Sequence, residues 1–300
     1  MKLMTALTTA FFILASPVYA GALVWMDSFP YEEGIALMQE FQKSHTDVDQ
    51  ITYVGIPAAQ KVARIIQEGE IGKTTTDVIT GSIAPIKEYR SRGIVVTEPI
   101  SASSMVSVIV YNTNKVKKED LPKSMEDLTD PKWTGRIGVW ARMADVVGLA
   151  PVWGSDRVVK FTERLVALKP VLYKNYAAMN AGISSGEIDI GINSLQQAQQ
   201  IMAKGAPVDF VVLEPVAIVQ TYAAVSAKGE NQKNAARFVS WLTSPEGAEA
   251  MERITRRGNV NVPTTKAAQL VKGRVVSVEK ESDPITLDLE TKLSRLIQGR

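Results

Sequence analysis

The chain has 300 residues, of which 45% are hydrophobic and 22% charged, a composition typical of a globular protein with one large or two medium domains. Its 34 basic and 32 acidic residues include no long run of like charges, so the charge pattern does not indicate nucleic-acid binding. The absence of cysteine excludes disulfides, cysteine-ligated zinc and a cysteine nucleophile.

Residues 1–20 have the pattern of a secretory signal peptide. Lys2 gives a positive start, the segment 3–15 is apolar and almost uncharged, and the small residue Ala20 ends the pattern. The apolar run is shorter than a transmembrane helix requires. We expect cleavage before Gly21 and export, which in a double-membraned bacterium leads to the periplasm.

The first part of the mature chain alternates strands and helices. Short apolar runs at 22–26, 51–54 and 77–80 predict three strands. Apolar residues at helical spacing between them, at 37–41 and 62–66, predict two helices. This order predicts a parallel sheet covered by helices.

A second set of strands and helices follows a longer predicted strand at 105–111. The sequence predicts a loop with short helix at 119–135, and then strands at 137–140, 188–192 and 208–213. Helices are expected near 156–168 and 175–185, with a glutamine-rich helix after residue 192.

An extended segment at 216–226 precedes the C-terminal helices. Apolar residues at 235, 238, 239 and 242 predict the first helix, and Ser244-Pro245 is a typical helix start. An amphipathic helix carrying Leu289 and Leu293 is expected near the C-terminus.

These elements predict an α/β protein with two lobes. The segments at 105–111 and 216–226 enter and leave the second unit, and paired crossovers make a natural hinge. We expect lobe 1 to begin with residues 21–108 and lobe 2 to span 109–218. Residues 219–300 would supply the return crossover, the rest of lobe 1 and the C-terminal helix.

Strand ends supply the candidate ligand-binding residues. Ligands of open parallel sheets bind beyond the carboxyl ends of the strands, which places a site in the cleft between the lobes. The candidates at these ends and on the return crossover are Asp27, Ser28, Phe29, Pro57, Ala58, Gly81, Ser82, Arg142, Asn175, Tyr176, Asn193, Gln196 and Tyr222.

The hypothesis of an anionic ligand rests on Arg142. A guanidinium near a helix start can hold a carboxylate through two parallel hydrogen bonds, although a surface salt bridge is the alternative. Short basic clusters such as Arg256-Arg257 are interpreted as solvated surface turns. Only Asp27 offers a carboxylate among the strand-end loops, which disfavours a polyamine.

Several segments resemble one family. The segment 111–138, which contains Asp130-Pro131-Lys132-Trp133, is very similar to the central part of bacterial extracellular solute-binding proteins of the ferric-iron, phosphonate and polyamine group. Segments 185–191 and 234–247 add weaker similarity. The resemblance implies a type II periplasmic-binding fold, hinge closure around the ligand, and delivery to the permease of an ABC importer.

The resemblance also bears on the ligand. Ferric-binding members carry an adjacent tyrosine pair where this chain has Leu195 and Gln196, so we expect no metal site and no cofactor. The single histidine, His45, is expected on the surface. The predicted ligand is a small organic anion: a carboxylate, including aromatic ones, or a phosphonate or phosphate ester. Polyamine and ferric iron are the alternative ligands.

Two other classes of protein compare with a transport protein as follows. With one histidine and no G-x-S-x-G, HExxH or P-loop motif, the sequence does not indicate an enzyme. A ligand-sensing partner of a membrane sensor would share this fold and cleft, and remains the alternative function. We expect a monomer that binds a small molecule and no nucleic acid.

Overall fold

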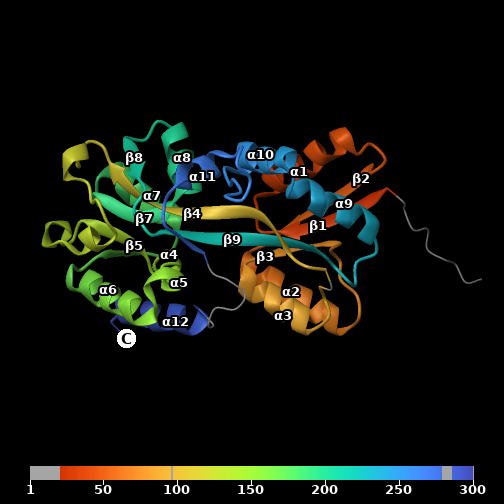
Figure 1. The fold of residues 1–300 in the computed structure, drawn as a ribbon, viewed down its shortest axis with the longest axis horizontal. Helices are drawn as coiled ribbons and strands as arrows, with labels where there is room; N and C mark the ends of the chain where they lie inside the picture. The colour runs from red at the N-terminus through yellow and green to blue at the C-terminus, as the bar shows by residue number, and fades with distance from the viewer. Residues whose placement is uncertain (1–20, 96, 279–285, 300) are drawn as a thin grey trace, which may run out of the picture.

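The structure is a computed structural model that describes residues 21–95, 97–278 and 286–299. The predicted signal peptide lies outside the described residues. Figure 1 shows two α/β units side by side along the long axis, joined at the centre by the long strands β4 and β9. The described residues contain no helix with the length and apolar character needed to cross a membrane.

The first unit is built on three parallel strands, as predicted. β1 (Ala22–Asp27) lies between β2 (Gln50–Gly55) and β3 (Val78–Gly81). The helices that connect and follow these strands are α1 (Tyr31–Ser44), α2 (Ala58–Glu70) and α3 (Ile83–Ser91).

Two strands belong to both units. β4 (Ile100–Asn112) and β9 (Val216–Val225) are antiparallel partners, and both are long enough to reach across the molecule. β9 pairs with β3 in the first unit, while β4 pairs with β7 in the second. The result is one ten-stranded sheet whose main path runs β2-β1-β3-β9-β4-β7-β5-β6.

The second unit repeats the parallel arrangement. β5 (Ile137–Trp140) pairs in parallel with β6 (Val171–Tyr173) and β7 (Ile190–Ser194), and β8 (Val208–Val211) adds to β4. Its helices are α4 (Ala144–Val147), α5 (Ala150–Trp153), α6 (Ser155–Ala167), α7 (Tyr176–Ser185) and α8 (Leu195–Ala203), and three short 3-10 helices, η1 (Lys118–Asp120), η2 (Glu126–Thr129) and η3 (Pro131–Trp133), fill the predicted loop.

The C-terminal part of the chain serves both units. α9 (Gln232–Leu242) and α10 (Pro245–Thr255) pack on the first unit, where Phe238 joins Trp25 and Phe41 in the core. α11 (Lys266–Val271), β10 (Val276–Val278) and α12 (Thr286–Ile297) pack on the second. The predicted cap at Ser244 is confirmed, because its side chain accepts a hydrogen bond from the amide of Gly247.

The chain therefore crosses between the units a third time, through residues 256–265. This segment lies against β4, where the amide of Ser104 donates to Gly258 O and Asn259 Nδ2 donates to Ser101 O. The sequence indicated only two crossovers, because this segment has neither strand nor helix periodicity. It brings the positive cluster Arg256-Arg257 to the junction of the units.

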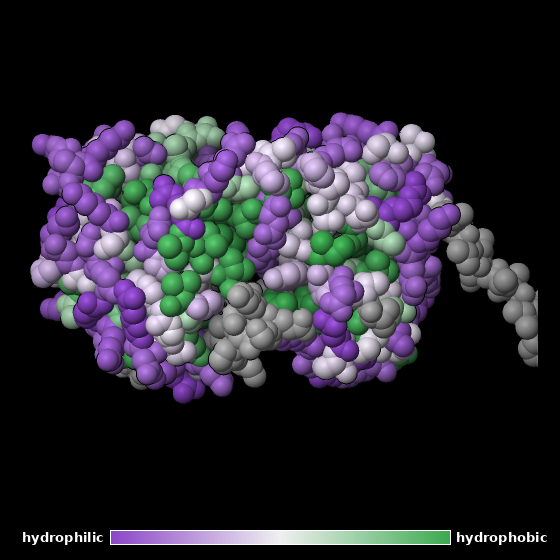
Figure 2. All heavy atoms as spheres, in the orientation of Figure 1, coloured by the Kyte–Doolittle hydropathy of each residue, from purple (hydrophilic) through white to green (hydrophobic). Residues whose placement is uncertain are grey.

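Each unit has its own core, and the carboxyl ends of the parallel strands of both units point toward the junction. Trp25 and Phe161 are fully buried in the first and second unit respectively. Figure 2 shows that apolar surface on the viewed face gathers over the unit that holds β5 and β7 and at the junction, with hydrophilic residues around the periphery. The junction is where a ligand cleft is expected.

Candidate ligand-binding site

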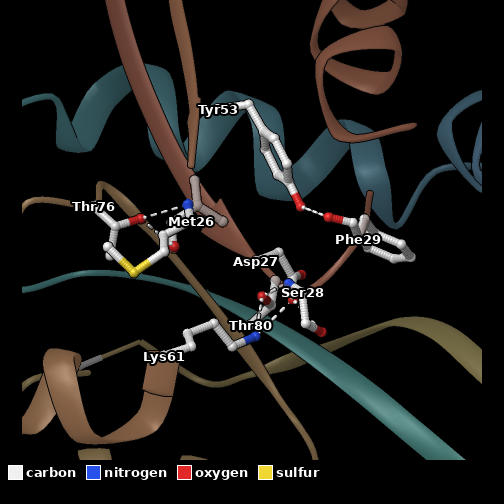
Figure 3. Close-up of polar contacts among 9 residues, drawn as sticks. Met26, Asp27, Ser28, Phe29, Tyr53, Lys61, Thr76 and Thr80 are labelled. Carbon is white, nitrogen blue, oxygen red and sulfur yellow. Dashed lines mark hydrogen bonds and ion pairs between the residues drawn. The ribbon is translucent and has the colours of Figure 1, made fainter. Parts of the chain in front are cut away.

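A buried ion pair lies at the carboxyl end of β1 (Figure 3). Lys61 Nζ, from α2, is 2.6 Å from Asp27 Oδ1 and donates to Thr80 Oγ1 as well. Thr80 Oγ1 donates to Asp27 Oδ2 at 2.5 Å, and the amide of Ser28 donates to Oδ1. Burial opposes the charge on Asp27, but the attraction of Lys61 and these hydrogen bonds together lower its pKa. Asp27 is thus neutralised within the first unit.

A second cation, Arg257, lies over the ring of Phe29, the next aromatic residue after Asp27. The Arg257 guanidinium lies 4.7 Å from the centre of the Phe29 ring, and Phe29 is buried and fixed by Tyr53, whose hydroxyl donates to Phe29 O. On its other side, Arg257 Nε donates to Gln196 Oε1 of α8 at 2.7 Å. Arg257 therefore bridges the first strand-end loop of one unit and a helix start of the other.

Arg257 has no carboxylate partner of its own among the described residues. Its Nη groups make no hydrogen bond to the part of the chain that the structure describes. Burial lowers the pKa of Arg257, while Asp27 and Glu33 act in the opposite direction from a distance. A recessed guanidinium without a counter-ion is costly, and an anion bound at its Nη groups would remove that cost.

Glu33 is a second carboxylate, after Asp27, whose charge acts on Arg257. It lies in the first turn of α1, and burial raises its pKa, although Arg257 and Arg256 favour its charged form. One of its oxygens, Oε2, is buried and accepts no hydrogen bond from the described residues. Arg256 and Arg257 both act on this one carboxylate, so positive charge is in excess among these three groups.

The second unit contributes a hydroxyl-rich wall at the ends of β5 and β6. Tyr176 Oη donates to Asp145 Oδ2 at 2.8 Å, and Ser107 Oγ donates to Asp145 Oδ1 at the same distance. The Tyr176 ring packs 4.8 Å from Trp140. Burial, followed by the nearby charge of Asp145, raises the pKa of Tyr176 well above its ordinary value. Arg142 and Arg257 both act on this hydroxyl.

Arg142 lies at the carboxyl end of β5, but its charge is already compensated. Its guanidinium donates to Glu290 of α12, with Nη2 2.7 Å from Oε1, and stacks over Trp140. The Arg142 side chain is 63% exposed. The salt-bridge alternative describes Arg142 in this structure, with a partner that sequence reasoning did not consider.

The remaining candidates fall into two groups. Gln196 and Phe29 contact Arg257, and Asn193 is buried with its amide donating to Asn180 Oδ1. The others lie at strand or helix ends without a described contact to Arg257: Asn175 caps α7, Pro57, Ala58 and Ser28 are exposed, Gly81 and Ser82 are half-buried, and Tyr222 pairs with Gly81 on β9.

Sequence reasoning missed Arg257, Lys61 and Asp145. The interpretation of Arg256-Arg257 as a solvated surface turn is wrong for Arg257, because residues 256–265 follow the hinge strand into the junction. Lys61 lies in the amphipathic helix α2, where a lysine is ordinarily solvated. A lysine on the buried side of α2, near Ile65, was the one available signal.

A large groove lined by described residues lies elsewhere. It measures 1080 Å³ and lies between β9 and the α11–β10 segment, and its lining includes Gln220, Tyr222 and Val278. Neither Arg257 nor Gln196 lines it. Of the predicted site residues, Tyr222 alone is in its lining, so the groove is separate from the cluster around Arg257.

Comparison with known proteins identifies a family to which most of the chain is similar. The profile of bacterial extracellular solute-binding proteins matches residues 31–249. The major ferric iron-binding protein of Neisseria meningitidis is 30% identical over 184 residues, which cover 56% of this chain and 55% of that protein. The chain thus matches about half the length of this curated relative.

Solved structures agree on the fold. Iron-bound HitA of Pseudomonas aeruginosa superposes with a TM-score of 0.74 at 19% identity, covering 93% of this chain and 98% of HitA. AfuA of Actinobacillus pleuropneumoniae with bound fructose-6-phosphate gives a TM-score of 0.66 at 19% identity, covering 93% and 97%. The two-lobed α/β architecture is that of a type II periplasmic-binding protein. This chain belongs to the bacterial extracellular solute-binding protein family.

Proposed function

We propose that the protein is an exported solute-binding protein that captures a small organic anion between its two units and delivers it to the permease of an ABC importer. The ligand would be a carboxylate, a phosphonate or a phosphate ester. The observation that carries the proposal is the guanidinium of Arg257, which lies between Phe29 and Gln196 without a carboxylate partner among the described residues.

Hinge motion accounts for access to this site. Arg257 contacts both units, so the cluster opens when the units separate about β4 and β9. An anion that binds the Nη groups of Arg257 while Nε stays on Gln196 would favour the closed arrangement. A closed form that is populated only with ligand is what a permease can recognise.

Ferric iron is the ligand named for the N. meningitidis relative, and it is the competing candidate. A ferric site needs anionic oxygen donors, yet Gln196 here accepts from a guanidinium. Among the described residues, no group of three or more His, Asp or Glu side chains is placed to hold a metal ion. The positive charge of Arg257 supports an anion instead.

A thermal-shift screen tests the proposal. The mature chain from Gly21 onward is melted with citrate, benzoate, methylphosphonate, glucose 6-phosphate, spermidine or ferric citrate. A ligand that binds only the native state stabilises it by about 2.7 kcal/mol at a hundredfold excess over Kd. We expect shifts with one or more of the anions and none with spermidine. A shift confined to spermidine, or to ferric citrate without citrate, contradicts the proposal.

Substitution of the arginine then locates the site. We expect Arg257→Gln to weaken anion binding at least about thirtyfold, corresponding to about 2 kcal/mol, since it removes a recessed charge that pairs with the ligand. The matched control is Arg253→Gln, which lies on α10 in an exposed pair with Glu40 and is expected to leave the affinity unchanged. Equal effects of the two substitutions would place the anion elsewhere.

A further inference from the structure

We propose that Lys61 determines the charge of the ligand, although Lys61 pairs with Asp27 and does not contact Arg257. By neutralising Asp27, Lys61 leaves Arg257 as the uncompensated charge of the junction. Lys61 is thus a specificity-determining residue that acts through Asp27. The inference rests on the proposed anion site and names the residue that makes that site positive.

Asp27 is the one carboxylate among the described residues that forms an ion pair with Lys61. Both residues are 4% exposed, and their charged atoms are 2.6 Å apart. Thr80 completes the enclosure by donating to Oδ2, so the carboxylate of Asp27 is fully engaged on the side of the first unit. Phe29, two residues further along, carries the Arg257 guanidinium on its ring. Asp27 is therefore close enough to act on Arg257, but it is already paired.

The net charge of this cluster is small, so the loss of a single charge changes it substantially. Glu32 also acts on Glu33, but Glu32 is exposed and its charge is screened by solvent. Among the buried and half-buried groups, with every one ionised, Lys61, Arg256 and Arg257 oppose Asp27 and Glu33, which leaves one net positive charge. Removing the charge of Lys61 brings the balance to zero. Removing the charge of Asp27 raises it to two, and removing both restores one. In a recessed site of low effective dielectric, a change of one such charge strongly alters the interaction energy with a bound anion.

The experiment measures affinity by isothermal titration for citrate, benzoate, methylphosphonate and glucose 6-phosphate. The proteins are the mature wild type, Lys61→Met, Asp27→Asn and the double variant. For each anion that the wild type binds, we expect Lys61→Met to weaken binding about tenfold or more and Asp27→Asn to strengthen it. The double variant should bind within about threefold of wild type. Circular dichroism melts establish which variants are folded.

A matched control separates this effect from general loss of a lysine. Lys73→Met removes a lysine from the same unit, where Lys73 pairs with Glu230 on the surface, and it should leave every affinity unchanged. If one single variant does not fold, the other single variant and the double variant decide by the same criteria.

The outcomes are distinguishable. Opposite changes in the two single variants, with recovery in the double variant, support the role of Lys61. No change in the single variants, changes in the same direction, or a double variant as weak as Lys61→Met, overturn it while leaving the anion site intact. A wild type that binds none of the four anions overturns the proposed function and this inference with it.

Discussion

Two aspartates, one in each unit, are equally buried and behave in opposite ways. Asp27 and Asp145 are both 4% exposed, and both lie beside the junction of the units. Burial acts to raise the pKa of Asp27, but the charge and hydrogen bond of Lys61, together with the hydrogen bonds from Thr80 and Ser28, outweigh it and lower the pKa. The pKa of Asp145 is raised, because burial outweighs the hydroxyls of Ser107 and Tyr176. One lysine accounts for the difference.

The two units thus hold their buried acids in different ways. The first unit holds its acid as a neutral ion pair and leaves Arg257 available. The second unit offers an acid surrounded by hydroxyl donors, which tolerates protonation. Burial alone therefore does not determine the charge of an aspartate; the partner supplied by a distant segment does.

The largest expected effect is on the ion pair. Asp27→Asn leaves Lys61 buried without a counter-ion, so we expect a loss of about 3–5 kcal/mol in the free energy of unfolding. Urea denaturation at neutral pH measures it. Asp47→Asn is the control, since it breaks an exposed pair with Arg237 and should have a much smaller effect on stability. Similar losses in both variants would remove the distinction between the two kinds of pair.

An intermediate effect is expected in the second unit. Tyr176→Phe deletes one of the two side-chain hydroxyls that donate to Asp145, and we expect a loss of about 1–2 kcal/mol at neutral pH. The exposed Tyr31 gives the matched control, because Tyr31→Phe should be neutral. A neutral Tyr176→Phe would mean that Asp145 does not depend on this donor.

The smallest effect, and the sharpest in pH, concerns Asp145→Asn. A raised pKa in the folded state means that the proton is bound more tightly in the folded protein. The group therefore makes its full contribution to the stability of the fold at pH values below its pKa in the unfolded chain. That stability is lost as the pH rises through the raised folded value. At pH 7 we expect Asp145→Asn to be neutral or stabilising by less than about 1 kcal/mol.

The pH dependence separates the two acids. Between pH 7 and pH 4, the wild type should gain stability relative to Asp145→Asn. Asp27 acts in the opposite sense: its contribution is present above 3.8 and is lost as the pH falls through its lowered folded-state pKa. Urea denaturation at several pH values compares the two variants with wild type. A stability difference between wild type and Asp145→Asn that is independent of pH would contradict the raised pKa of Asp145.

Much of the fold followed from local signals in the sequence. The strand at 137–140 and the helix that begins at Pro245 lie where the sequence predicts them, because apolar runs, helical spacing and capping are properties of neighbouring residues. The parallel order of β1, β2 and β3 followed in the same way from the alternation of strands and helices. The family resemblance of 111–138 pointed to the same architecture.

The candidate site could be predicted from the sequence only in part. Strand ends led to Phe29, Tyr176 and Gln196, since the carboxyl edges of parallel sheets are predictable from the order of elements. The sequence by itself determined that these loops would meet between two α/β units. It also favoured an anion, although through Arg142.

The charges of the site were decided by the tertiary structure alone. Arg142 is paired because α12 returns Glu290 to the second unit, and Arg257 is available because residues 256–265 follow β4 into the junction. Lys61 reaches Asp27 across 34 positions of the chain. Whether an ionised group is solvated, paired or left without a partner depends on which distant segments surround it. The spacing of residues along the sequence does not reveal those contacts.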